Sequence, residues 1–383
     1  MIGNPLGNPL GNPLGLKIGG GTGSSIGDIV TRMSPPSGNY LLANGATPAK
    51  ADYPRLFEKL GQQALKNPVA PSNPGTSTST FIPVASSLAY DGVYFYGVAN
   101  GSSGIYRSID GQTWTTTAAG IFTNGGAAIS SANGSIFGTD QVSSNLVKRS
   151  VDNGVTWSSV TLPRADTWGK MFYFSGRYIL FSTSSSGILY SSDLVNWTEV
   201  GISGSYTDMI IGNGVAVITT NTSSGSNGVI YVSTNGATWQ QVLLPNGIFI
   251  SGAFQNGLII VSSRSTTAVY TTVDGVAWTA STPQPGNGAF AFMAAGDGLF
   301  FAMTSVNIVY TSIDGDVWEP TAFGGTAFNW NRIIYGNKRL LAREGTNGGY
   351  SMTWDRYNFD SNTLFALPTI KLQGGLRAYV RAK

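Results

Sequence analysis

The sequence predicts a mainly β protein, and three observations lead to this prediction. Charged residues make up only 11% of the 383-residue chain, whereas Gly occurs 51 times. Such a composition favours short strands and tight turns over long exposed helices. Pairs that favour two-residue hairpin turns lie between short apolar runs, for example Asn213-Gly214 and Asp297-Gly298. Finally, a short motif that ends in Trp is repeated along the chain.

The spacing of the repeated motif predicts the architecture. The motif reads SIDGQTW at residues 108–114 and SIDGDVW at residues 312–318, and a degenerate last copy reads TWDRYNF. Successive copies are 43, 40, 42, 39, 40 and 41 residues apart, measured along the series Trp114, Trp157, Trp197, Trp239, Trp278, Trp318 and Phe359. A period of about 40–50 residues with several short strands is typical of a β-propeller with one blade per repeat. We therefore expect seven four-stranded blades over residues 85–363.

Each copy of the motif is predicted to form a hairpin turn. In the first copy, the Asp110 carboxylate can accept N–H bonds from the residues that follow it, and Gly111 can adopt a positive φ. Trp114 then begins the fourth strand as an apolar anchor, and we expect the six Trp side chains to be buried in equivalent positions. An Asp in every blade could suggest catalysis, but the hairpin explains its repetition.

The motif resembles the Asp-box of the BNR-repeat family, which occurs in sialidases and in many non-catalytic propellers. Six repeats match it well. The sequence departs from the family pattern at Asn235, which replaces Asp, and in SSDLVNW at residues 191–197, which lacks the central Gly. The resemblance implies a propeller and leaves its activity open.

Residues 1–26 form a distinct segment in which GNPL occurs three times. Pro fixes φ and Gly disfavours regular structure, so no helix is expected here. Leu6, Leu10 and Leu14 recur every four residues, and we expect these apolar side chains to dock the chain onto a partner protein. The alternative is a flexible tail. The following GGGTGSS is expected to be a hinge.

Residues 27–84 and 364–383 are expected to form one discontinuous domain around the propeller, with a helix in YPRLFEKLG. Residues 27–63 resemble the phage tail-collar domain in the order of GDIV, LLANG and YPRLFEKLG, with Tyr40 and Ala43 where the family usually has Trp and Cys. That domain continues into an F-x-L-P strand. Here FIPV precedes the propeller and FALP follows it. The propeller is therefore expected to be an insertion, which its closely spaced ends permit.

The two resemblances together imply a bacteriophage tail fibre or tail-tip adhesin, assembled in the bacterial host cytoplasm and located in the tail of the virion. In this interpretation the N-terminal peptide binds other virion tail proteins, and the propeller contacts a receptor on the host surface. Collar-type fibres are often homotrimers, whereas a closed propeller needs no partner to protect its edges. Both oligomeric states remain open.

Composition argues against several classes of function. The net charge is +3 without a basic run, so nucleic acid is not an expected partner. No apolar run reaches the ~18 residues of a membrane-spanning helix, so membrane insertion is not expected. The chain has no Cys and no His, which excludes disulfides, thiol nucleophiles, His-based metal sites and His general bases. We expect no metal and no cofactor.

The ligand site is predicted at one mouth of the central channel, where the innermost strand of each blade begins. Aligning these strands on their Gly-containing turns places five aromatic residues at this end: Trp168, Tyr206, Phe249, Phe290 and Trp330. Two residues further, on the same side of the strand, stand the charged residues Lys170, Asp208 and Arg332, and Arg164 precedes one strand. Aromatic faces beside polar groups suit a sugar or an apolar receptor loop. The alternative is that the aromatic residues pack between blades.

Three functions follow from these patterns. The first is a receptor-binding adhesin that recognises a host glycan or an outer-membrane protein. The second is a structural tail or capsid decoration protein without a ligand. The third is a sialidase-like enzyme, which the Asp-boxes suggest. By resemblance such an enzyme would need an arginine triad, a Tyr nucleophile assisted by Glu, and an acidic general acid/base. No such set can be assembled, so we expect no catalytic residues and no enzyme activity.

Overall fold

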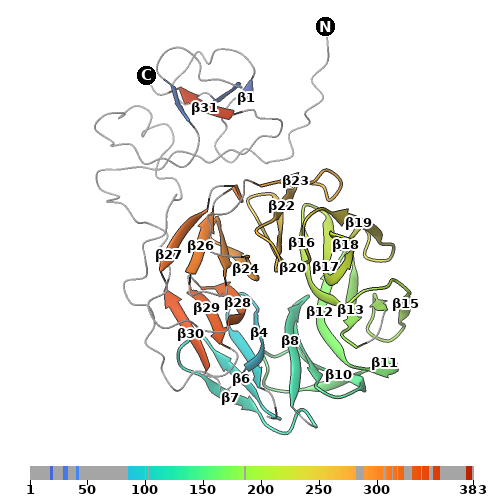
Figure 1. Cartoon of the computed structure of the whole chain (residues 1–383). Helices are drawn as coiled ribbons and strands as arrows, with labels where there is room; N and C mark the ends of the chain where they lie inside the picture. Colours follow the sequence, from blue (N-terminus) through green and yellow to red (C-terminus); the bar gives the residue numbers. More distant parts are fainter. Residues whose placement is uncertain are drawn as a thin grey trace. The chain divides into compact units, whose positions relative to one another are not determined.

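The computed structural model divides the chain into two compact units (Figure 1). One unit comprises residues 1–69 and 355–383, and the other comprises residues 70–354. Regular structure in the described residues consists of β-strands, which confirms the mainly β class. The described residues are 18–19, 29–32, 40–42, 85–99, 101, 103–123, 125–184, 187–281, 289–304, 308–312, 314–316, 318–322, 330–337, 339–344, 348–353 and 377–381.

Six four-stranded antiparallel sheets of the larger unit stand around a common axis as the blades of a β-propeller (Figure 1). Each blade uses four consecutive strands, and the first of them is innermost. Blades 1 to 3 comprise Ala85–Tyr90 (β4), Phe95–Ala99 (β5), Ile105–Ser108 (β6), Thr115–Ala118 (β7), Gly126–Ala132 (β8), Ser135–Asp140 (β9), Ser144–Ser150 (β10), Ser158–Asp166 (β11), Trp168–Phe174 (β12), Arg177–Ser182 (β13), Ile188–Ser191 (β14) and Thr198–Val200 (β15). Blades 4 to 6 comprise Tyr206–Gly212 (β16), Val215–Ser224 (β17), Asn227–Ser233 (β18), Gln240–Leu244 (β19), Phe249–Gln255 (β20), Leu258–Ser263 (β21), Val269–Thr272 (β22), Thr279–Ala280 (β23), Phe292–Gly296 (β24), Leu299–Met303 (β25), Ile308–Ser312 (β26) and Glu319–Ala322 (β27).

A further sheet, which we call the closing sheet, has three strands: Trp330–Gly336 (β28), Arg339–Glu344 (β29) and Gly348–Thr353 (β30). The prediction of seven four-stranded blades is therefore wrong in number, because the described residues form six such blades. The segment around Phe359, where the last repeat was expected to end, lies outside the described residues.

The closing sheet lies between blade 6 and blade 1 and completes the ring (Figure 1). The Asn337 side-chain amide donates a hydrogen bond to the Ile109 carbonyl of blade 1 at 3.2 Å. Leu341 packs with Phe95 and lies so close to Gly111 that a Cβ at this glycine would be 2.7 Å from it. The first and last sheets are thus joined by both polar and apolar contacts.

In blades 2, 4, 5 and 6 the first hairpin turns as the Asn-Gly and Asp-Gly pairs predict. Asn213 and Gly214 have φ values of 51° and 75°, which a two-residue type I′ turn requires. The Asn213 side chain also reaches the next blade, where its amide donates to the Gly257 carbonyl at 2.6 Å and to the Val273 carbonyl at 2.9 Å. The turn residue therefore sets the hairpin and also ties two blades together.

The repeated motif forms a hairpin turn between the third and fourth strands. Asp110 Oδ1 accepts N–H bonds from Gln112 and Thr113, each at 2.8 Å. The buried Ser108 hydroxyl accepts the Gly111 N–H at 2.8 Å and donates to Asp110. Each side chain therefore satisfies a backbone group that the tight turn leaves without a strand partner.

The two departures from the motif keep the same turn. The Asn235 side-chain oxygen accepts N–H bonds from Ala237 and Thr238 at 2.8 and 2.9 Å, as the carboxylates do elsewhere. Leu194 stands where the central Gly is missing, and its φ is 65°. This left-handed conformation costs an L-residue about 1–2 kcal/mol. The Leu194 side chain is buried in an apolar cluster with Leu189, which offsets part of that cost.

The six Trp residues of the motif lie immediately before the fourth strands and differ in burial. Trp318 is 5% exposed, whereas the other five are only half-buried, so the prediction of equivalent burial is wrong. All five half-buried indoles still pack on apolar clusters that contain residues of the preceding sheet. Trp157, for example, packs on a cluster that contains Tyr96 of blade 1. The motif thus fastens each blade to its neighbour.

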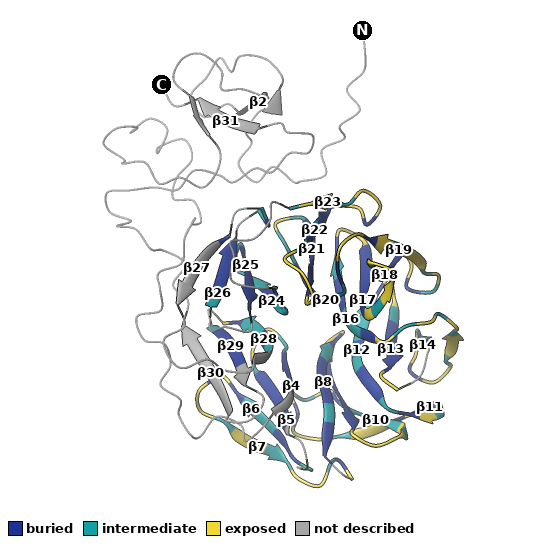
Figure 2. Ribbon diagram, viewed as in Figure 1, coloured by how far each residue is buried: buried dark blue, intermediate teal, exposed yellow. Residues whose placement is uncertain are grey.

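Apolar clusters fill the spaces between neighbouring blades, and in every four-stranded blade except blade 4 the second strand is the most buried (Figure 2). Every residue of β21 and of β25 is buried, while β23 is exposed. A strand covered on both faces reads as a continuous apolar run, as in LFFAM of β25. The outer strands face solvent and carry Thr, Ser and Gln instead.

The smaller unit contains a four-stranded sheet that joins the two ends of the chain. Ile18–Gly19 (β1), Ile29–Arg32 (β2) and Tyr40–Leu42 (β3) assemble with Arg377–Arg381 (β31), and β31 pairs antiparallel with both β2 and β3. The expected helix in YPRLFEKLG lies outside the described residues. The domain boundaries at 27–84 and 364–383, and the collar-like identity of this unit, remain predictions.

Leu6, Leu10 and Leu14 of the expected docking peptide also lie outside the described residues, and so does the Gly-rich hinge. In the part of the chain that is described, no helix is long and apolar enough to cross a membrane.

Candidate functional site in the central channel

Six of the seven described innermost strands share an irregularity at the end where they begin, and β24 of blade 6 is the exception. The pairing register between the first and second strands shifts between Ala85 and Ser87 in blade 1 and between Trp168 and Met171 in blade 3. Equivalent shifts occur in β8, β16, β20 and β28. A β-bulge of this kind re-aims the side chains that follow it. At this end of the channel, strict alternation of side chains is therefore interrupted.

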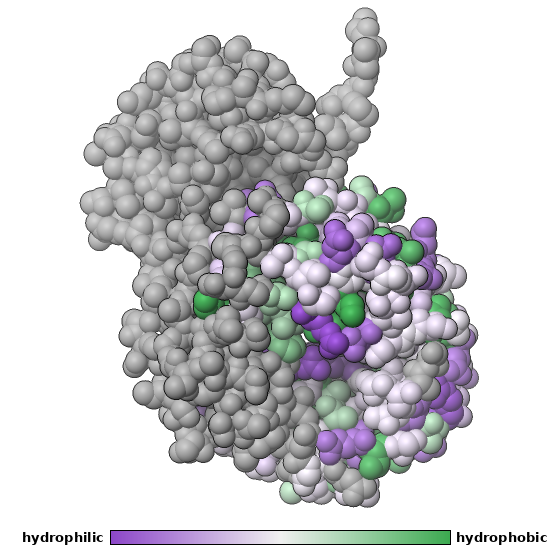
Figure 3. All heavy atoms as spheres, in the orientation of Figure 1, coloured by the Kyte–Doolittle hydropathy of each residue, from purple (hydrophilic) through white to green (hydrophobic). Residues whose placement is uncertain are grey.

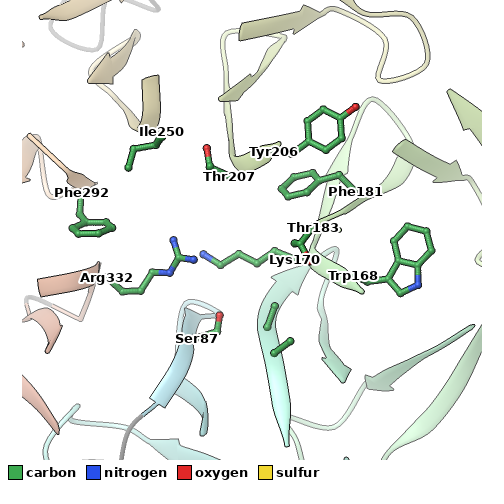
Figure 4. A pocket seen from close by; sticks show the side chains of 13 residues that line it. Ser87, Trp168, Lys170, Phe181, Thr183, Tyr206, Thr207, Ile250, Phe292 and Arg332 are labelled. Atoms are coloured by element: carbon green, nitrogen blue, oxygen red, sulfur yellow. The ribbon is translucent and has the colours of Figure 1, made fainter. Parts of the chain in front are cut away.

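The bulges surround a cavity of about 410 Å³ (Figure 4). Its size falls in the range of small-ligand sites, about 300–1,000 Å³. Side chains from the innermost strands form most of its wall. The lining residues are Ser87, Ala127, Ala128, Trp168, Gly169, Lys170, Phe181, Thr183, Tyr206, Thr207, Ile250, Phe292 and Arg332. In the space-filling view, hydrophilic residues gather beside the hollow in the middle of the ring (Figure 3).

Two cations dominate the charge of this cavity. Lys170 extends from β12 and Arg332 from β28, and their charged ends point toward each other across the channel (Figure 4). Burial lowers the pKa of the Lys170 amino group below its ordinary value; the Asp208 carboxylate opposes this, and the nearby Arg332 adds to it. Asp208 itself is not among the lining residues, and it accepts the Met209 N–H at 3.0 Å.

The predicted ring of exposed aromatic faces is not found. Trp168 is 1% exposed, Tyr206 4%, Phe249 0% and Phe290 1%, so these rings pack as core between blades. In β12, β16 and β20 the bulge explains the difference, because it turns the ring at the first position of the strand into the core, although Trp168 and Tyr206 still contribute to the cavity wall. In Figure 4 the Trp168 ring points away from the cavity while Lys170, two residues later, points into it. The prediction that these two positions share one side of the strand is wrong.

Each buried aromatic residue has its own partners. Phe249 packs with Tyr270, with ring centroids 5.5 Å apart, and Phe290 packs with Trp318 at 4.8 Å. Burial raises the pKa of Tyr206 to about 12, and its hydroxyl donates to the Ile202 carbonyl. For Trp330 the structure describes only the backbone, which begins β28.

Arg164 is held near the mouth by other protein groups. Its guanidinium forms ion pairs with Asp166 and with Glu199, the latter at 2.9 Å, and lies 4.9 Å from the centre of the Trp168 ring. It therefore covers the indole rather than facing the cavity. Its predicted role as a ligand-binding residue is not supported by this geometry.

Several lining residues were missed at the level of the sequence, including Ser87, Thr207 and Ile250. Thr207 and Ile250 directly follow Tyr206 and Phe249, so a bulge after each first aromatic position would have brought them into the channel. A signal for this bulge exists in blade 3, where Gly169 stands between Trp168 and Lys170. Gly in a strand often marks a bulge.

The described lining residues of the cavity offer groups for binding and include no pair of carboxylates. No carboxylate is among its lining residues, so a pair of acids for glycoside hydrolysis is missing from its described wall. Among the residues that the structure describes, no group of three or more acidic side chains could hold a metal ion. What remains is two cations, a few hydroxyls and apolar surface, which suit recognition of a polar ligand.

Comparisons with known proteins support the fold. No protein-family model matches the sequence, and no curated protein matches it. Similar solved structures include virginiamycin B lyase from Staphylococcus aureus, with a TM-score of 0.58 and 14% identity over 76% of this chain and 98% of the lyase. YCF48 from Cyanidioschyzon merolae has a TM-score of 0.55 and 15% identity over 71% of this chain and 96% of YCF48. A GH74 enzyme from Niastella koreensis has a TM-score of 0.53 and 15% identity over 77% of this chain and 44% of that enzyme. At these identities the likeness shows a shared propeller fold and no shared function.

Proposed function

We propose that this chain is a receptor-binding protein of a bacteriophage tail, and that its propeller contacts the host cell surface through the channel cavity. The collar-like smaller unit mounts the propeller, and Leu6, Leu10 and Leu14 dock the chain onto other virion tail proteins. The protein is made in the host cytoplasm and acts in the virion. The observation that carries this proposal is the contrast between the repeated turns and the cavity, whose lining residues differ from blade to blade.

A binding role is favoured over an enzymatic one. Two of the similar propellers are enzymes, and a histidine-to-alanine variant of the lyase is catalytically inactive. This chain has no His at all, so it cannot use such a residue. Its channel cavity presents Lys and Arg without an acidic partner in its lining. Groups of this kind bind and orient a ligand, whereas general acid–base catalysis needs a proton donor and acceptor of suitable pKa.

Competition for host cells tests the proposal. The purified full chain, labelled with a fluorophore, is added to host cells of the phage that encodes it. We expect saturable binding, and an excess of unlabelled chain should reduce the rate at which the phage adsorbs. The same chain added to a bacterium that this phage does not infect is the control. If the chain neither binds host cells nor slows adsorption, it is a structural tail or decoration protein instead.

A further inference from the structure

Two like charges face each other inside the channel, and this arrangement is unusual for a stable core. Lys170 comes from blade 3 and Arg332 from the closing sheet, so the two side chains approach from separate parts of the ring (Figure 4). Both are half-buried. Bringing two cations together in a partly dehydrated space raises the free energy of the folded state.

Among the described residues, no carboxylate forms an ion pair with either cation. The ion pairs of Arg164 with Asp166 and Glu199 lie outside the channel and involve neither Lys170 nor Arg332. The charge of Asp208 acts on Lys170, but the two side chains are not within ion-pair distance. A purely structural role would favour a fixed acidic partner, because charges that are removed from water are normally paired. An external anion would supply that partner.

The residues around the two cations indicate which other chemical groups the anionic ligand has. Thr207 presents a hydroxyl beside the cavity and is held by a 2.9 Å hydrogen bond to Thr219. Phe292 and Ile250 provide apolar surface on the neighbouring innermost strands (Figure 4). A volume of about 410 Å³ admits a sugar-sized group rather than a bare ion alone. The cavity therefore offers charge, hydrogen-bonding groups and an apolar wall within one small space.

We propose that the channel cavity binds an anionic group, a carboxylate or a phosphate carried by a saccharide, between Lys170 and Arg332. The planar Arg332 guanidinium can bind two oxygens of such a group at once, and the Lys170 ammonium adds a compact positive charge. This inference rests on the proposed function, because it names the chemistry of the host ligand. It also explains why the two cations are left unpaired in the free protein.

Calorimetric titration of the full chain with three monosaccharides tests the inference. D-glucuronic acid carries a carboxylate, D-glucose 6-phosphate carries a phosphate, and D-glucose carries no charge. We expect at least one acidic sugar to bind more tightly than glucose, and we expect added salt to weaken its binding. The acidic sugar that binds more tightly identifies the source of the anion. Equal binding of glucose and both acidic sugars, or no binding of any of them, would overturn the inference.

Variants locate the site. Lys170→Gln and Arg332→Gln should each weaken binding of the preferred acidic sugar roughly tenfold, since each removes one charge-assisted hydrogen bond. Arg264→Gln removes an exposed cation that does not line the cavity and should bind like the wild type. Circular dichroism establishes that each variant is folded. Unchanged binding by both channel variants would place the anion site elsewhere and overturn the inference.

The outcomes for this inference and for the proposed function can be separated. If host cells bind the wild type and both channel variants equally well, the anion site plays no part in adsorption, and the receptor-binding function stands without it. If the acidic sugar binds and the channel variants lose it, but host cells do not bind the chain, the anion site stands and the receptor-binding function fails.

Discussion

The two ends of the blades differ in how strongly their residues repeat from blade to blade. At the end with the third-to-fourth strand turns, one motif recurs with nearly the same hydrogen bonds, as in Ser108 and Asp110 of blade 1 and Thr272 and Asp274 of blade 5. At the end where the innermost strands begin, equivalent positions carry different residues, such as Ala128 in blade 2 and Lys170 in blade 3. A residue that recurs in every blade stabilises the fold of the blade. A residue that occurs in one blade only is free to take part in a site formed by the whole ring. Function is therefore best sought at the end that varies.

The largest effect is expected from the Trp residues that fasten the blades. Trp318 is 5% exposed, packs on Phe290 and donates its indole N–H to the Gly315 carbonyl at 3.2 Å. Trp318→Ala should lower the free energy of unfolding by about 3–5 kcal/mol, the usual loss for a large buried aromatic residue. Chemical denaturation measures this change. Trp197→Ala, at the half-buried equivalent position, should lower the free energy of unfolding by less. Equal losses in the two variants would contradict the expectation that burial sets the size of the loss.

A smaller effect is expected from the turn itself. The Ser108 hydroxyl is the acceptor for the buried Gly111 N–H. Ser108→Ala leaves this N–H without that acceptor and should cost about 1–3 kcal/mol, the penalty for an unsatisfied buried polar group. Thermal unfolding measures the loss, and Ser203→Ala at an exposed position is the control. A variant that unfolds at the wild-type temperature would mean that this hydroxyl does not hold the turn.

The smallest effect, with the opposite sign, is expected at the channel. Lys170→Met removes a half-buried charge that repels Arg332, so the melting temperature at pH 7 should rise by about 1–3 °C. The pH dependence has a defined sign. The folded-state pKa of Lys170 lies below its ordinary value of 10.5, so the unfolded chain binds more protons in the window beneath 10.5. Wild-type stability should therefore rise relative to Lys170→Met as the pH increases through that window.

Melting curves of both proteins at several pH values check this prediction. A loss of stability in Lys170→Met at neutral pH would show that the lysine supports the fold, and the contrast between the two ends of the blades would then disappear.

The sequence alone determined the features that depend on local geometry. Trp spacing near 40 residues predicted the propeller, and the Asn-Gly and Asp-Gly pairs predicted the hairpin turns that Asn213 and Asp110 form. These features are local, because a positive φ or a carboxylate above two N–H groups depends on a few neighbouring residues. The number of four-stranded blades did not follow from the spacing, because the degenerate last repeat was counted as a seventh such blade.

Only the tertiary structure decided which side chains reach the channel. Strict alternation placed Trp168 and Lys170 on one side of the strand, but the bulge between them sends the indole into the core and the amine into the cavity. One extra residue inverts the facing of every position beyond it, and the sequence marks that residue only weakly. The meeting of Lys170 with Arg332, 162 positions later in the chain, likewise depends on closure of the ring, which no local pattern encodes.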